Sequence, residues 1–154
     1  MKYIFGLIVL IFLIHPGIEA SEKIDYMNAI PVDLSVSTTD NEFVYSPDLL
    51  VFETEKLYKL VMKNSGRLKH VFCSKYMEDS VTTHKIVVLD FEKYPVAEMF
   101  EGSVCKFIIF PDNHIEWYFT PKKPGSNFDI TCYLPGHEEM RGKVQIVINP
   151  NTIK

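Results

Sequence analysis

Short apolar runs recur along the chain from Val32 onward, and clusters of turn residues separate them. One run carries Tyr58, Leu60 and Met62 on the same face, because successive side chains of a strand point to opposite faces. Runs of this kind predict strands at Val32–Ser37, Leu49–Glu53, Lys56–Lys63, His84–Leu89, Val104–Phe110, Ile115–Thr120, Phe128–Cys132 and Lys143–Ile148. Short strands at this spacing predict an all-β domain, either a sandwich or a barrel.

The stretch between about residues 74 and 103 departs from this strand pattern. Turn residues become scarce there, and the apolar residues of Phe91–Phe100 favour a short helix that Pro95 interrupts. We therefore expect a short helical or irregular excursion between about residues 74 and 103.

The first residues have the pattern of a signal peptide. Lys2 gives a positive start, and a mostly apolar run follows at Tyr3–Ile14. This run is shorter than the ~20 apolar residues that span a bilayer, and Ala20 offers a cleavage site before Ser21. We expect cleavage between these two residues. An uncleaved anchor is the alternative, because Ile18 is larger than the small residue usual at its position.

Cleavage would leave an exported protein without stable membrane insertion, which we expect in the periplasm. The predicted organisation is a signal peptide at 1–20, a mobile polar lead-in at 21–31 and one domain at 32–154. A length of 154 residues, with 47% hydrophobic residues, fits a single globular core.

The charge balance excludes one class of partner. The chain has 16 Lys and Arg against 20 Asp and Glu, and its formal net charge is −4. No basic surface is available to neutralise phosphates, so we expect no nucleic-acid partner. The three cysteines have to be interpreted by position, because export permits disulfides.

The most informative segment is Thr131–Val144, which holds three side chains able to bind a metal. Cys132 ends a predicted strand, His137 follows a Pro-Gly turn, and Met140 comes three residues later. One loop between two strands thus presents a thiolate, an imidazole and a thioether. A fourth ligand has to come from elsewhere, and His70 is the best candidate because a turn precedes it where the chain re-enters a strand.

The donor types indicate which metal this site would take. A thiolate, two imidazoles and a weak thioether form a soft, trigonal site that suits a copper ion changing between Cu(I) and Cu(II). Zinc would favour four strong donors in a tetrahedron. Glu138 and Glu139 do not indicate a zinc protease, because a His-Glu-x-x-His helix would need a histidine where Arg141 stands. We therefore predict one copper ion per chain.

With these residues the chain resembles the cupredoxins, the small blue (type 1) copper proteins such as azurin, plastocyanin and amicyanin. The resemblance covers about residues 46–148, and its most specific element is Cys132-x4-His137-x2-Met140. It implies a Greek-key β-sandwich (cupredoxin-like) with copper at one end. It also implies that His70, Cys132 and His137 are the equatorial ligands and that Met140 is the axial ligand.

The ligand loop combines two spacings. Four residues separate Cys132 from His137, but only two separate His137 from Met140, whereas family members with the first spacing usually have a longer second gap. A different axial distance would change the colour and the reduction potential, which respond to that weak bond. We also expect backbone amides near His70 and Cys132 to donate hydrogen bonds to the thiolate.

Cys73 and Cys105 are the remaining cysteines. Cys73 comes three residues after His70, so strand alternation directs its side chain to the opposite face from that histidine. In an exported protein we expect a Cys73–Cys105 disulfide that tethers the excursion to the sandwich.

The resemblance implies electron transfer as the activity. Our leading hypothesis is a carrier of single electrons between redox proteins, such as a cytochrome or a membrane oxidase complex, and not an enzyme. The five histidines are fewer than multicopper oxidase chemistry needs. The alternative is a periplasmic copper-handling protein that stores copper, confers resistance or delivers the metal to an oxidase. A third hypothesis is an adhesive or structural sandwich that has lost its metal.

Overall fold

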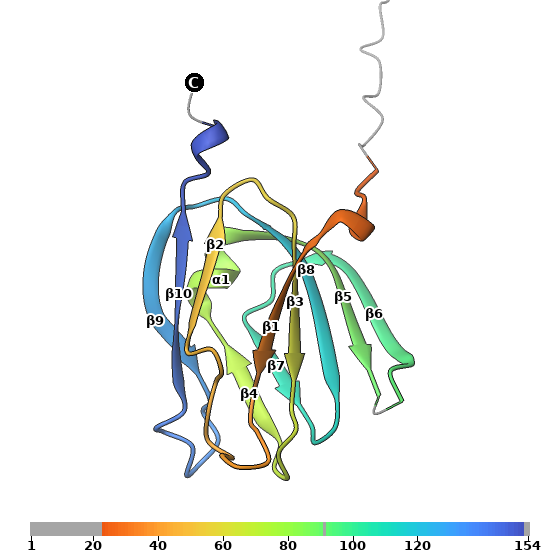
Figure 1. Ribbon diagram of the computed structural model, residues 1–154, viewed down its shortest axis with the longest axis vertical. Coiled ribbons are helices and arrows are strands. Elements are labelled where there is room, and N and C mark those ends of the chain that lie inside the picture. Colours follow the sequence, from red (N-terminus) through yellow and green to blue (C-terminus); the bar gives the residue numbers. More distant parts are fainter. Residues whose placement is uncertain (1–22, 91, 153–154) are drawn as a thin grey trace, which may run out of the picture.

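The structure is a computed structural model that describes residues 23–90 and 92–152. These residues form two five-stranded sheets that pack against each other (Figure 1). The first sheet has the strand order β1 (Ile30–Ser35), β3 (Tyr58–Lys63), β8 (His114–Pro121), β5 (Val81–Leu89) and β6 (Pro95–Gly102). The second has the order β2 (Leu49–Glu53), β10 (Arg141–Val147), β9 (Gly125–Thr131), β4 (His70–Cys73) and β7 (Lys106–Ile109). The predicted signal peptide, 1–20, lies outside the described residues.

The order of the strands is that of a sandwich whose chain crosses repeatedly between the sheets. Strand β1 pairs with β3 and strand β2 with β10 in parallel, and the other pairs are antiparallel. Among the described strands, only β5–β6 and β9–β10 are both consecutive in the chain and neighbours in a sheet. Connections of this kind define Greek-key sandwiches. The predicted all-β sandwich is confirmed.

The core lies between the sheets and consists of side chains that alternate inward along the strands. Tyr58, Leu60 and Met62 of β3 are buried, as the alternation predicts. Trp117 of β8 is 1% exposed, and its Nε1 donates a hydrogen bond to Oγ1 of Thr83 at 3.0 Å. Full burial of a large apolar side chain contributes roughly 1.5–3 kcal/mol, so these inward faces hold the two sheets together.

The bounds of most strands differ from the prediction by a few residues. Strand β2 is as predicted, but β1 begins at Ile30 instead of Val32. The expected lead-in at 21–31 therefore ends within a strand, and a short helix, η1 (Tyr26–Asn28), precedes it. No alternating run predicted β4, because all four of its residues are buried, but its start at His70 agrees with the strand expected to begin there. The second short helix, η2 (Pro150–Thr152), follows β10.

The helix predicted at Phe91–Phe100 is wrong. Residues 95–102 form β6, an edge strand that pairs with β5, and Phe91 lies outside the described residues. Pro95 has no N–H to donate within a helix, but the first residue of an edge strand tolerates it. Pairing with β5 gives the backbone N–H and C=O groups on one side of β6 their hydrogen-bond partners. A helix interrupted at Pro95 would leave some of these groups without partners.

The helix of this stretch is α1 (Lys75–Ser80), which directly follows β4. Ser74 caps it: the Ser74 Oγ accepts a hydrogen bond from the Met77 N–H at 3.1 Å and donates one to Oδ1 of Asp129 at 2.7 Å. The buried Met77 side chain anchors the helix on the core. Within the described residues, no helix is both long enough and apolar enough to cross a membrane.

Three loops meet at the end of the sandwich drawn at the bottom of Figure 1. They are the β1–β2 loop (36–48), the β3–β4 loop (64–69) and the β9–β10 loop (132–140). The topology thus brings together side chains that are far apart in the chain, such as His70 and His137, which are separated by 67 positions.

Candidate metal centre

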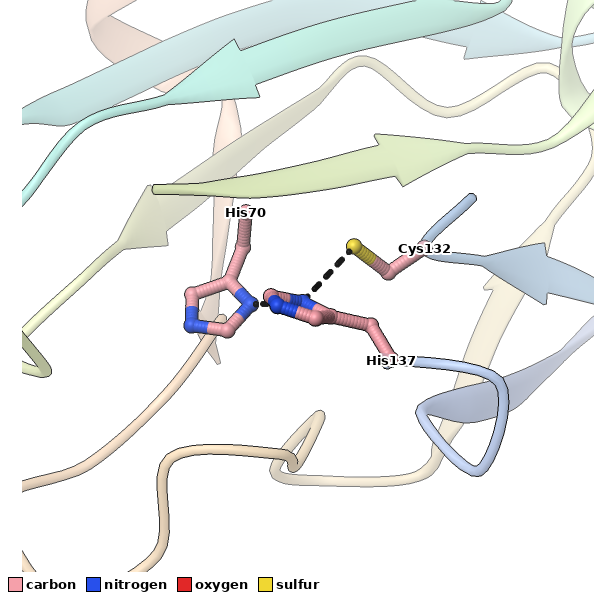
Figure 2. Close-up of side chains that lie close together, drawn as sticks. All are labelled: His70, Cys132 and His137. Carbon is pink, nitrogen blue, oxygen red and sulfur yellow. Dashed lines mark hydrogen bonds between the residues drawn. The ribbon is translucent and has the colours of Figure 1, made fainter. Parts of the chain in front are cut away.

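Three of the four predicted ligands lie together at this end of the sandwich. Figure 2 shows the side chains of His70, Cys132 and His137 pointing toward one another. The Nδ1 atoms of His70 and His137 are 3.1 Å apart, and Sγ of Cys132 is 3.4 Å from Nδ1 of His137. All three ligand atoms lie within 4.8 Å of one another. The side chains are buried, with exposed fractions of 0%, 4% and 8%.

Two of the three separations in this cluster fit bonds to a single metal ion. With bonds of about 2.0 Å to nitrogen and about 2.3 Å to sulfur, as in zinc sites, separations of 3.1 and 3.4 Å correspond to angles of roughly 100° at the ion. Two imidazoles and one thiolate are also the donor set of trigonal copper sites. The described residues therefore form a site that can hold a metal ion.

His70 is positioned by the β3–β4 loop that leads into β4. The Asn64 side chain organises this loop, because its Nδ2 donates to the carbonyl oxygens of Leu68 at 2.8 Å and Ile109 at 3.0 Å. Its Oδ1 accepts a hydrogen bond from the Gly66 N–H at 3.0 Å. Asn64 is 1% exposed, so these bonds satisfy a buried amide and fix the loop against β7. His70 then begins β4 opposite Ile109.

Cys132 follows the last residue of β9. Its Sγ accepts a hydrogen bond from the backbone N–H of Val71 at 3.3 Å, which confirms that an amide beside His70 donates to this sulfur. The Cys132 N–H in turn donates to the carbonyl oxygen of Met140 at 3.3 Å and closes the base of the β9–β10 loop. Hydrogen bonds of this kind orient a ligand and tune the metal that it binds.

His137 lies in a tight turn of the β9–β10 loop. Its N–H donates to the carbonyl oxygen of Leu134 at 3.0 Å, and its own carbonyl oxygen accepts from the Met140 N–H at 2.9 Å. Gly136 has a φ of 84°, a left-handed conformation that glycine adopts without strain. The turn therefore returns the imidazole toward Cys132 within five residues.

Met140 is the fourth predicted ligand and is 1% exposed. The contacts that place it are the backbone hydrogen bonds to Cys132 and His137. It therefore belongs to the same closed loop as two of the clustered ligands, and its role as the axial ligand stays a prediction.

The other two cysteines lie side by side. Cys73 and Cys105 are free thiols, and Cys105 and the Tyr133 hydroxyl are close enough to influence the ionisation of Cys73. Burial raises the pKa of the Cys73 thiol, the Tyr133 hydroxyl opposes this rise, and Cys105 adds to it. The Ser74 N–H also donates to the Cys105 carbonyl oxygen at 2.9 Å. Cys73 and Cys105 thus lie close together as thiols, and the disulfide between them stays a prediction.

Two residues of the β1–β2 loop complete the surroundings of the cluster. Oε1 of Glu42 is 3.3 Å from Nε2 of His70. The Phe43 ring packs edge-on against both imidazoles, with its centroid 4.9 Å from that of His137 and 6.3 Å from that of His70. Sequence reasoning missed both residues, because Glu42 lies 28 positions before His70 and no motif connects the two.

Glu42 and His70 each influence the pKa of the other. Burial tends to raise the pKa of Glu42, but hydrogen bonds from the Arg67 and Leu68 N–H groups and from His70 hold it below its usual value. Burial lowers the pKa of His70, and the bond to Glu42 opposes that change. The arrangement thus favours an ionised carboxylate beside a ring that donates from Nε2.

Comparison with known proteins finds similarity in structure only. No family model and no curated protein matches the sequence. A multi-copper oxidase from Pediococcus acidilactici aligns with a TM-score of 0.58 and 13% identity, over 90% of this chain and 30% of the oxidase. A multicopper oxidase from Campylobacter jejuni aligns with a TM-score of 0.57 and 10% identity, over 87% of this chain and 32% of the oxidase. Auracyanin A, a "blue" copper protein from Chloroflexus aurantiacus, aligns with a TM-score of 0.46 and 14% identity, over 77% and 98% of the two chains.

At these identities the comparisons establish the fold alone. The chain spans about a third of the length of the two oxidases, whose domains are cupredoxin-like. The protein has the cupredoxin fold, as the sequence predicts, and it carries a His-Cys-His cluster that can hold a metal at one end of the sandwich.

Proposed function

We propose that this protein is an exported type 1 copper protein that carries single electrons between redox partners in the periplasm, and that it is not an enzyme. The observation that carries the proposal is the buried cluster of His70, Cys132 and His137, whose ligand atoms lie within 4.8 Å of one another. These residues would bind copper, with Met140 as the weak axial ligand. Bound copper would supply the one-electron couple between Cu(II) and Cu(I).

The hydrogen bonds around the cluster support a carrier more than a site that releases its metal. Asn64 fixes the loop before His70, the Val71 amide fixes the Cys132 sulfur, and two backbone bonds close the turn at His137. Ligands locked by such bonds stay in nearly the same place when the charge of the ion changes. Small rearrangement is what fast electron exchange requires.

The surface beside the site supports a redox partner that binds briefly. Phe43 packs against the His137 imidazole and is 44% exposed, and Tyr133 next to Cys132 is 58% exposed. Electrons would pass through this surface, across Leu134 and Pro135, to a cytochrome or a membrane oxidase complex. A small interface would suit such a transient encounter.

Copper titration of the purified protein tests the proposal. We expect one Cu(II) ion per chain and an intense visible charge-transfer band that ascorbate bleaches, because a thiolate bonded to Cu(II) produces such a band. Cys132→Ser should abolish the band, and the matched variant Cys105→Ser should keep it. A band that survives in Cys132→Ser, or no copper binding by the wild-type protein, would contradict the proposal.

The copper-handling alternative uses the same ligands but predicts a different fate for the reduced metal. A carrier should keep one copper ion through repeated reduction and re-oxidation, and its band should return at full intensity. A protein that stores or delivers copper should instead lose Cu(I) to a competing chelator during the reduced phase. Loss of copper in each cycle would favour the alternative over electron carriage.

A further inference from the structure

The Glu42 carboxylate is the feature of this site that the predicted ligands do not explain. Its Oε1 accepts hydrogen bonds from the backbone N–H groups of Arg67 at 2.9 Å and Leu68 at 2.6 Å, and its Oε2 lies 3.1 Å from the Arg67 nitrogen. The same Oε1 is 3.3 Å from Nε2 of His70, whose side chain is 0% exposed. One carboxylate thus ties the β1–β2 loop to the β3–β4 loop and to a predicted ligand.

Gly66 leaves the space that this arrangement needs. A Cβ atom at Gly66 would lie 2.6 Å from Oε1 of Glu42 and 1.9 Å from Oγ of Ser37. Real side chains do not approach so closely, so a larger residue at this position would displace the carboxylate. The turn that Asn64 organises therefore directs the N–H groups of Arg67 and Leu68 toward Glu42. Because Gly66 has no Cβ atom, the Glu42 carboxylate can approach this turn closely.

The geometry places Glu42 on the far side of His70 from the ligand cluster. Nδ1 of His70 faces Nδ1 of His137 at 3.1 Å, whereas Nε2 faces Glu42. A carboxylate at Nε2 accepts the ring N–H and leaves Nδ1 without a proton, ready for a metal. This contact fixes the tautomer and the orientation of the ring and makes Nδ1 a stronger donor.

We propose that Glu42 is a positioning residue of the copper site that holds the Nε2–H of His70 and favours Cu(II) over Cu(I). The inference rests on the proposed function, because it requires His70 to bind copper through Nδ1. A negative charge attracts the doubly charged ion more strongly than the singly charged one. Glu42 therefore lowers the reduction potential of the site.

Charge-neutral variants test the effect on the metal. Glu42→Gln removes the charge and keeps an accepting oxygen, whereas Glu42→Ala removes both. Glu139→Gln is the matched control, because Glu139 is exposed and lies two residues after His137. Replacing such a partner typically weakens metal binding by about 10- to 100-fold. We expect Glu42→Gln to weaken Cu(II) binding about tenfold more than Cu(I) binding, because the lost charge attracts the doubly charged ion more strongly. A tenfold difference raises the one-electron potential by about 59 mV. Glu139→Gln should change the potential by much less.

Nuclear magnetic resonance of the His70 ring gives a readout that does not depend on electron transfer. In the diamagnetic Cu(I)-loaded protein, the wild type and Glu139→Gln should show a protonated Nε2 and an unprotonated Nδ1. Glu42→Ala should lose the slowly exchanging Nε2–H, because its acceptor is gone.

The outcomes separate this inference from the proposed function. If the wild type binds copper but Glu42→Gln and Glu139→Gln have equal potentials, the role of Glu42 is wrong and the proposed function stands. A His70 ring that is protonated at Nδ1 would likewise overturn the inference. If the wild-type protein gives no charge-transfer band, the proposed function fails and the inference fails with it.

Discussion

At the scale of single residues, a few side chains of the candidate site have distinct roles. His70, Cys132 and His137 present ligand atoms within 4.8 Å of one another. Glu42 holds the far side of one imidazole, and Phe43 covers the other. The strong donors therefore define the position of a bound ion, and the neighbouring residues influence its reduction potential.

Met140 is the residue whose role the loop spacing leaves most open to experiment. Met140→Leu keeps the volume of a side chain that is 1% exposed, so the free energy of unfolding should change by less than about 1.5 kcal/mol. If the thioether is the axial ligand, its loss should raise the reduction potential and shift the visible band, because a donor that stabilises Cu(II) is removed. Voltammetry and optical spectra measure both. Values identical to the wild type would show that Met140 is not a ligand.

The sequence makes some of these residues predictable and hides others. Cys132, His137 and Met140 fall within nine positions, so their spacing alone indicates a loop of ligands. Glu42 and Phe43 belong to no motif, and only the meeting of two loops gives them a role. Contacts between loops depend on tertiary structure, which periodicity does not encode.

At the scale of elements, alternation predicts the half-buried strands and fails for the others. Strand β3 buries every second residue and was predicted, whereas β4 buries all four of its residues and carries no alternating signal. Strand β6 has no buried residue and was mistaken for a helix. A strand is therefore recognisable from sequence only where its two faces differ.

A predicted disulfide between Cys73 and Cys105 would join the two ends of the segment between β4 and β7. Cys73 ends β4, Cys105 directly precedes β7, and the Ser74 N–H next to Cys73 donates to the Cys105 carbonyl oxygen at 2.9 Å. A bridge would stabilise the folded protein by roughly 3–4 kcal/mol, because it restricts the unfolded chain across a loop of about thirty residues. Denaturant unfolding of the apo protein with and without reductant measures this difference.

Cys105→Ser is the control for that experiment, since its stability should not respond to the reductant. Counting thiols in the unfolded, oxidised apo protein gives an independent answer. One free thiol is expected, from Cys132. Three free thiols would show that the pair stays reduced.

At the scale of the whole molecule, the sandwich serves as a rigid frame for one end. Two sheets enclose an aromatic core around Trp117, and three loops that leave these sheets converge on the cluster. Because the strands fix where each loop starts and ends, the ligand atoms stay close together even though His70 and His137 are 67 positions apart. The fold therefore supplies the positional constraint, and a few loop residues supply the chemistry.

X-ray absorption at the copper edge can show whether His70, Cys132 and His137 bind one copper ion in a fixed arrangement, because it reports the atoms bound to the metal in each oxidation state. For the protein loaded with one copper ion, we predict one short sulfur contact and two imidazole nitrogens in both Cu(II) and Cu(I), with nearly unchanged distances. A spectrum without a sulfur neighbour, or a ligand set that changes on reduction, would contradict the account.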